Sequence, residues 1–193
     1  MKKLLIISLV ILSFLANSNA QFTKIGGGLG LSSGFYFHEQ TTQDANRSGK
    51  IAISLKGIYE ISVPLHISPS ITVFYPHITK NQTDKTTVSS MMFDINGHYV
   101  FNSLDKFEFY GLAGLDVLLA KKKDVYEASG TFKETDNALG LNLGIGTYMK
   151  MTETFDIYGE AKYLINGKYN QFMLNVGVLL NIDWMKKHEN SDM

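Results

Sequence analysis

Apolar and polar residues alternate with a period of two along most of the chain after residue 20. The clearest case runs from Phe172 to Trp184, where every residue of one phase is apolar and the other phase is mainly small or polar. Such alternation is typical of a β-strand whose two faces meet different surroundings. Helical periodicity is hard to find, so the pattern predicts an all-β fold.

Eight segments show this alternation, and the lengths of their connections alternate too. The segments span residues 25–37, 51–59, 65–75, 91–101, 107–119, 139–145, 155–165 and 172–184. Short connections lie at 61–64, 102–106, 151–154 and 166–169, and long polar ones at 38–49, 76–87 and 120–136. Transmembrane barrels combine short periplasmic turns with longer external loops in this way. The order predicts an antiparallel up-and-down arrangement of eight strands.

The polar phase indicates which face of the strands meets water. In the first segment, that phase consists of Gly26, Gly28, Gly30, Ser32 and Gly34. A water-facing strand would favour threonine, lysine and glutamate, because glycine weakens a strand and packs against nothing. The interior of an eight-stranded barrel is narrow, so small residues there make room for a few large ones. We therefore place the polar phase inside the barrel and the apolar phase on its outer surface.

Charged residues of the polar phase then become interior residues. Enclosed charges need opposite charges and hydrogen bonds, so we expect them to pair with one another. The predicted interior charges are Lys56, Glu60, Asp94, His98, Glu108, Asp116, Asp156, Glu160 and Lys162.

Aromatic residues of the apolar phase gather at the two ends of the segments. Near the short connections these are Tyr59, Tyr99, Phe101, Phe107, Phe155 and Trp184, and near the long connections they are Phe37, Tyr75 and Tyr163. Two aromatic belts match the interfacial girdles of outer-membrane barrels. The pattern thus predicts an eight-stranded antiparallel up-and-down transmembrane β-barrel; an ordinary aromatic core is the alternative.

The first twenty residues have the features of a secretory signal peptide. Lys2 and Lys3 precede an apolar run from Leu4 to Leu15, and small residues precede a cleavage point near Ala20. After residue 20, no apolar stretch is long enough for a membrane helix. We predict a cleaved signal at 1–20, a barrel at 21–184 in the cell outer membrane, and a polar periplasmic tail at 185–193.

Composition excludes several classes of function. The 193 residues suit a single domain, and the absence of cysteine excludes disulfides and cysteine-based zinc sites. The equal numbers of basic and acidic side chains, 18 of each, argue against nucleic-acid binding. The five histidines are scattered without metal-ligand spacing, so we expect no metal and no cofactor.

The chain resembles the small outer-membrane β-barrels of the porin-like, opacity-antigen type, built like OmpA and OmpX. The resemblance rests on the signal peptide, the glycine-rich first segment, the Tyr-Gly-x-Ala segments at 110–113 and 158–161, and the alternating last segment. It covers residues 22–184, and its motifs specify no single function. Members commonly end at an aromatic residue of the last strand, whereas here Met185 to Met193 follow Trp184.

Three short motifs carry candidate chemistry. Residues 30–34 match the letters of a G-x-S-x-G nucleophile elbow, which needs a following helix that is not predicted. His66 and Ser68 share a face, as a hydrolase would require, but no acidic partner can be assigned and interior filling is the simpler interpretation. Lys121-Lys122-Lys123 could meet lipopolysaccharide phosphates, although a solvated loop of mixed charge is the favoured interpretation.

We therefore expect a non-enzymatic outer-membrane barrel with a structural, surface-interaction or narrow porin-like role. Its expected partners are outer-membrane lipid, including lipopolysaccharide, and a surface partner bound through the long loops, with the barrel a monomer. A soluble periplasmic or secreted lipocalin-like barrel that binds an apolar ligand is the main alternative. A membrane-embedded lipid hydrolase is a weaker one.

Overall fold

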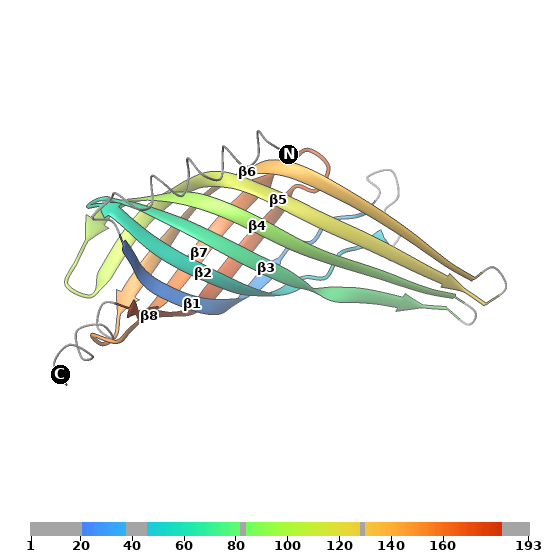
Figure 1. The fold of residues 1–193 in the computed structure, drawn as a ribbon, viewed down its shortest axis with the longest axis horizontal. Coiled ribbons are helices and arrows are strands. Elements are labelled where there is room, and N and C mark those ends of the chain that lie inside the picture. The colour runs from blue at the N-terminus through green and yellow to red at the C-terminus, as the bar shows by residue number, and fades with distance from the viewer. Residues whose placement is uncertain (1–20, 38–45, 82–83, 128–129, 183–193) are drawn as a thin grey trace, which may run out of the picture.

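The chain forms a closed barrel of eight antiparallel strands (Figure 1). The structure is a computed structural model that describes residues 21–37, 46–81, 84–127 and 130–182. The strands are β1 Gln21–Ser32, β2 Ile51–Ser62, β3 Leu65–Lys80, β4 Asp84–Ser103, β5 Phe107–Tyr126, β6 Gly130–Lys150, β7 Phe155–Ile165 and β8 Gln171–Asn181. Each strand pairs with the next one in sequence, and β8 pairs with β1 to close the ring. The predicted eight-stranded up-and-down barrel is confirmed.

The apolar and polar phases lie on the outer and inner faces of the barrel, as the sequence predicts. Apolar side chains of the outward phase are widely exposed, with Leu29 at 61%, Leu115 at 58% and Leu139 at 71%. Charged and small residues of the other phase point inward. A lipocalin-like barrel would show the reverse arrangement, with its apolar phase enclosed around a ligand. No helix in the described part of the chain is both long and apolar enough to cross a membrane.

Strand β1 ends at Ser32, earlier than the alternation predicts. The chain turns at Gly34, whose φ of 76° lies in the left-handed region that favours glycine. After this turn, Phe35 and Phe37 enter the barrel and are 4% and 3% exposed. The assignment of Phe37 to the outer aromatic girdle is therefore wrong. A turn resets which face each residue meets, so the alternation before Gly34 does not carry through to Phe37.

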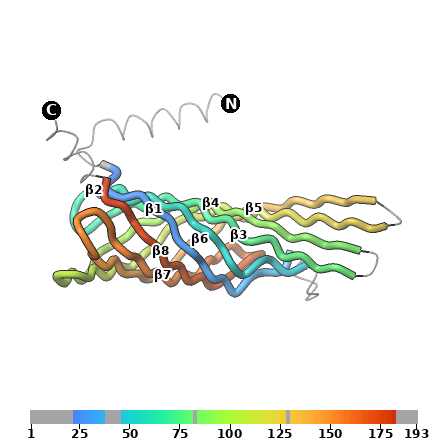
Figure 2. The backbone as a smooth tube through the Cα atoms, turned by 90° about the horizontal axis from the view of Figure 1, so that it is seen from below, coloured from blue at the N-terminus to red at the C-terminus, as the bar shows by residue number. Residues whose placement is uncertain are grey.

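Two of the predicted long loops consist mostly of strand. β3 and β4 pair out to Lys80 and Lys85, and β5 and β6 pair out to Tyr126 and Gly130. These two hairpins join through β4 and β5 into a four-stranded sheet that extends beyond the barrel (Figures 1 and 2). The alternation did not predict these strands, because both of their faces meet water and neither face is consistently apolar. Most of the third predicted long loop, at 38–49, lies outside the described residues.

The short connections lie where the sequence predicts them. β2 and β3 are joined by Val63 and Pro64, β4 and β5 by residues 104–106, β6 and β7 by residues 151–154, and β7 and β8 by residues 166–170. All four connections are short, but the last of them lies at the end of the barrel where the long hairpins emerge, since β7 runs toward that end.

Interior glycines leave space for large rings, as a narrow barrel requires. A Cβ added at Gly28 would lie 2.5 Å from the Tyr158 hydroxyl oxygen and 2.5 Å from the Val176 carbonyl oxygen. Tyr158 is itself 1% exposed. We expect Gly28→Val to lower the free energy of unfolding by about 1–3 kcal/mol, because overpacking forces the ring or backbone to move.

Urea unfolding of the purified barrel in detergent micelles measures this effect. Gly111→Val is the matched control, because Gly111 faces outward and nothing lies within 4 Å of a Cβ added there. Equal losses of stability in the two variants would contradict the assigned interior packing.

Candidate functional site

A layer of buried charges crosses the middle of the barrel interior. Lys56 Nζ lies 2.5 Å from Glu160 Oε2, and Lys162 Nζ lies 3.0 Å from Asp94 Oδ2. These four side chains come from β2, β4 and β7 and are all at most 5% exposed. Buried ion pairs need additional hydrogen bonds to offset the loss of hydration. Tyr110 donates one to Glu160 at 3.1 Å, and Ser70 donates one to Asp94 at 2.8 Å.

Rings and histidines fill the interior between this charged layer and the short turns. The His98 ring stacks on Tyr110 with centroids 4.4 Å apart, and its Nδ1 lies 2.6 Å from the Tyr148 hydroxyl. Tyr110 and Tyr148 also stack, at 4.4 Å. Beyond them, Lys24 pairs with Asp156 at 2.7 Å. This end of the barrel is therefore closed by rings and an ion pair.

An apolar cluster fills the opposite end of the interior. The Phe35 and Tyr169 ring centroids lie 4.5 Å apart, and the Tyr169 hydroxyl oxygen lies 3.1 Å from the Phe37 carbonyl oxygen. The same cluster includes Ala52, Phe74, Val88, Met92, Leu118, Ala120, Ala138, Leu164 and Met173. Together, the three layers pack the described interior with side chains.

The extended sheet of β3–β6 has two chemically different faces. Lysines lie on the face that continues the outer surface of the barrel. Carboxylates lie on the other face, which continues the interior phase: Asp84, Asp124, Glu134 and Asp136. On that inward face, Lys122 pairs with Asp124 at 3.2 Å, and Thr86 donates to Asp124 at 2.7 Å. The run Lys121-Lys122-Lys123 is thus divided between the two faces.

Comparison with known proteins agrees with this architecture. Residues 4–181 match the family described as the outer membrane protein beta-barrel domain. The chain belongs to this family. Its place is accordingly the outer membrane, with the apolar outward phase against lipid. The sequence resemblance to small outer-membrane barrels is confirmed.

Several solved barrels share the fold. Ail, the attachment invasion locus protein of Yersinia pestis, is 15% identical with a TM-score of 0.54, over 83% of this chain and 99% of that chain. The N-terminal barrel of Pseudomonas aeruginosa OprF is 14% identical with a TM-score of 0.55, over 84% and 99% of the two chains. Neisserial surface protein A is 12% identical with a TM-score of 0.57, over 85% and 99%. No curated protein sequence matches. At these identities, the structural likeness shows the fold alone.

Most predicted interior charges are buried in this family member. Lys56, Asp94, His98, Asp116, Asp156, Glu160 and Lys162 are at most 5% exposed. Glu60 and Glu108 are only half-buried, because they lie near the short-turn rim, where Glu108 meets Lys150 at 2.6 Å. The apolar cluster was not expected from the sequence. The sequence feature that could have predicted this cluster is a group of large apolar residues, such as Phe74, Met92 and Leu118, that interrupt the polar phase.

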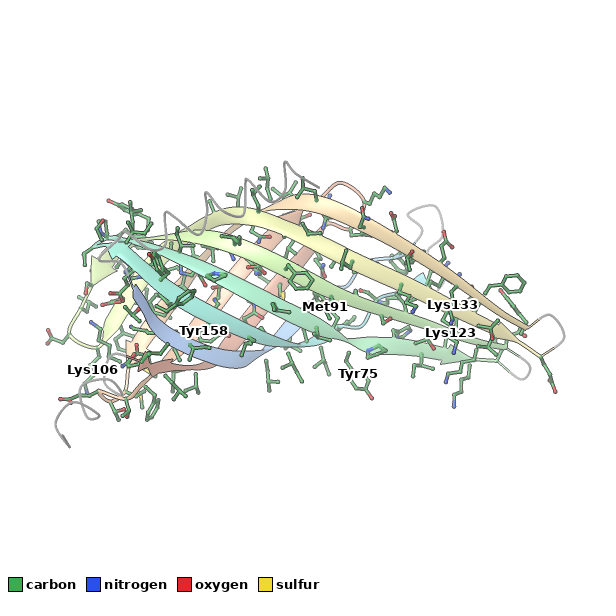
Figure 3. The ribbon with its side chains drawn as sticks, viewed as in Figure 1. Tyr75, Met91, Lys106, Lys123, Lys133 and Tyr158 are labelled. Atoms are coloured by element: carbon green, nitrogen blue, oxygen red, sulfur yellow. The ribbon has the colours of Figure 1, made fainter. Side chains whose placement is uncertain are left out.

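The predicted girdle residues that the structure describes lie on the outward phase, Phe37 excepted. Tyr75 is 71% exposed (Figure 3), Tyr99 55% and Phe101 61%. Phe107 and Tyr163 are also exposed, and Tyr59 and Phe155 are half-buried. Trp184 lies outside the described residues. The contact of the girdle residues with the membrane interface stays a prediction.

The candidate catalytic residues are packed into the barrel. His66 is 6% exposed and Ser68 is fully buried, and neither His66 Nδ1 nor Ser68 Oγ has a hydrogen-bond partner among the described residues. A nucleophilic serine needs a hydrogen-bonded base, and that geometry is not formed here. Ser32, the serine of the G-x-S-x-G letters, donates to Gln171 Oε1 at 2.5 Å and is followed by a turn. No cluster of three metal-ligating side chains occurs in the described ranges.

At the external rim, Asp136 accepts hydrogen bonds from the β7–β8 turn. The Tyr169 hydroxyl lies 2.8 Å and Lys168 Nζ 3.0 Å from Asp136 Oδ2. The Tyr169 hydrogen bond, followed by that of Lys168, lowers the pKa of Asp136 below its ordinary value. A carboxylate with a lowered folded-state pKa stabilises the fold above its unfolded-state pKa of about 3.9. That contribution is lost as the pH falls through the folded-state pKa.

We therefore expect the stability difference between the wild type and Tyr169→Phe to depend on pH. It should be constant between neutral pH and about pH 5, and should shrink below about pH 4 as Asp136 becomes protonated. Equilibrium unfolding of both proteins across this range gives the difference. A difference that grows on acidification would contradict the assigned contact.

Proposed function

We propose that this protein is a monomeric, non-enzymatic surface-interaction barrel that contacts a partner outside the cell through the extended β3–β6 sheet. The observation that carries the proposal is the sheet itself. β6 begins at Gly130 but pairs with β7 only from Leu141, and β3 pairs with β2 only as far as Phe74. About ten residues of β6 therefore project past β7 with an edge that no described strand covers.

An uncovered strand edge can accept an extended segment of another protein by backbone hydrogen bonding. The β3 edge is less suited to this, because Pro76 lacks an N–H group and the register shifts between Phe74 and His77. The β6 edge is regular, since β5 and β6 pair without a shift from Phe107 to Tyr126. We therefore place the main contact along β6.

The filled interior favours this function over a porin-like role. A channel needs a continuous polar path, whereas an apolar cluster occupies the external half of the described interior. Among the relatives in fold, Ail is named as an attachment invasion locus protein, which is consistent with a surface role.

Shortening the β5–β6 hairpin tests the proposal. Lys121 pairs with Thr135, and the next pair toward the membrane is Ala120 with Asp136. Replacing residues 121–135 with Asn-Gly keeps Asp136 and its contacts, and supplies a two-residue hairpin turn. We expect a folded barrel with unchanged heat-dependent gel mobility, and loss of adherence of expressing cells to host cells and matrix proteins. Unchanged adherence at equal surface expression would refute the proposed contact.

A matched control replaces residues 104–106 in a short turn with Asn-Gly, which should leave adherence unaltered.

Single-channel recording of the wild type in planar bilayers tests the alternative, a narrow porin-like role. We expect no stable conducting state. A steady conductance that both shortened variants retain would instead support the narrow pore.

A further inference from the structure

Exposed lysines occupy the outward face of the extended sheet, next to the lipid-facing surface. Lys121 and Lys123 follow Leu119 on the same face of β5, and Lys133 lies on the same face of β6. Lys80 and Lys85 lie on this face nearer the tip. The acidic residues of these strands all belong to the opposite face. At the tip, Glu127 and Asp84 line a shallow groove together with Lys80 and Lys85.

Two of these lysines face each other across the strand pair. Lys123 and Lys133 are register partners in β5 and β6, and both project near the extended end in Figure 3. Like charges directly opposite in an antiparallel pair destabilise it. The described ion pairs nearby use Lys122 and Lys168 instead. An anion placed between Lys123 and Lys133 would remove their repulsion.

A groove on the outer wall begins directly below these lysines. It has a volume of about 580 Å³, and Lys121 and its register partner Thr135 line its upper end, while Asn137 lies lower, opposite Leu119. Val73, Met91 and Leu119 form its apolar lower part. A second groove of about 660 Å³ lies nearer mid-membrane and extends across β1 to β6, and its outward-facing lining includes Ile71, Phe93, Ile95, Leu115 and Val117. Lys121 and Thr135 therefore lie above an apolar part of the outer wall that carries two grooves.

We propose that Lys121, Lys123 and Lys133 bind the phosphate of a phosphorylated glycolipid of the outer leaflet, with one of its acyl chains in the grooves beneath. Clustered cations near a membrane surface attract anionic headgroups. The chain-sized apolar groove favours a membrane lipid over a soluble polyanion, which would use the lysines alone. The proposal rests on the orientation of the barrel in the outer membrane and not on the proposed surface partner.

Native mass spectrometry of the full-length barrel in detergent, titrated with lipid A that carries both phosphates, tests this site. For Lys121→Gln/Lys123→Gln/Lys133→Gln, we expect roughly hundredfold weaker binding, since each lysine near the surface contributes on the order of a factor of five. The control Lys50→Gln/Lys106→Gln/Lys150→Gln removes the same charge at positions away from the outward face of the β5–β6 hairpin, and we expect it to change binding less than about threefold because distant exposed charges are screened. All six lysines are exposed, so both variants should fold with unchanged heat-dependent mobility.

Three further measurements separate the ligand chemistries. Dephosphorylated lipid A should bind the wild type as weakly as lipid A binds the first variant. The deacylated phosphorylated headgroup should bind weakly, because it leaves the grooves empty, and Val73→Trp should weaken lipid A binding by filling them. Equal losses in the two lysine variants, or binding of the deacylated headgroup as strong as that of lipid A, would each overturn the proposal.

Discussion

Replacing Lys56 with methionine should lower the free energy of unfolding by about 3–5 kcal/mol, because it leaves the Glu160 carboxylate buried without its cation. Lys56 Nζ and Glu160 Oε2 are 2.5 Å apart, and their side chains are 3% and 1% exposed. The remaining hydrogen bond from Tyr110, at 3.1 Å, offsets only part of this loss. Reversible urea unfolding in detergent or lipid vesicles measures the effect.

The double variant Lys56→Met/Glu160→Gln supplies the control. It removes the charge of both partners, so we expect it to recover most of the stability that the single variant loses. The interaction energy of the pair is the loss in the double variant minus the summed losses of Lys56→Met and Glu160→Gln measured singly. If the double variant were as unstable as the sum of the two single variants, the two charges would not be coupled and the interior layer would be described wrongly.

Replacing Leu115 with lysine should destabilise the inserted barrel by about 2–4 kcal/mol, because Leu115 faces lipid near the middle of the hydrocarbon layer. Its side chain is 58% exposed on the outer wall. A charge at this depth has neither water nor a protein partner. Unfolding in phospholipid vesicles, where the outward face meets acyl chains, reports the cost.

The same substitution at Leu119 is the matched control. Leu119 lies on the same face of β5, one outward position below Lys121, and is 43% exposed. Near the interface a lysine costs only about 0–1 kcal/mol, because its ammonium group reaches the headgroups. Equal costs at Leu115 and Leu119 would place the membrane at a different height on the barrel or remove it altogether.

The external hairpins show where sequence interpretation fails. Residues 76–87 and 120–136 contain many lysines, threonines and acids, which indicated loops, yet β3–β6 continue through them. Alternation is visible only when one face of a strand meets apolar surroundings. Outside the membrane both faces are wet, so the strands there are held by backbone pairing and leave no apolar pattern.

The pairing within the buried charged layer is a second feature that the sequence could not predict. Alternation placed Lys56, Asp94, Glu160 and Lys162 inside the barrel, but it could not say which cation meets which carboxylate. Lys56 and Glu160 are 104 residues apart in sequence, and Lys162 and Asp94 are 68 residues apart. Their pairing depends on the stagger of the closed sheet, which is a property of the whole ring.

The sequence by itself determined the strand number, the inward and outward faces, and the short turns, because each follows from local alternation with a period of two. Only the tertiary structure decided the closed register, the partners of the buried charges, and the position of Phe37 and Tyr169 inside the external end of the barrel. It also decided that Lys121, Lys123 and Lys133 share one face above the lipid-facing groove. These features depend on residues brought together across strands, and no local pattern encodes the distance between them.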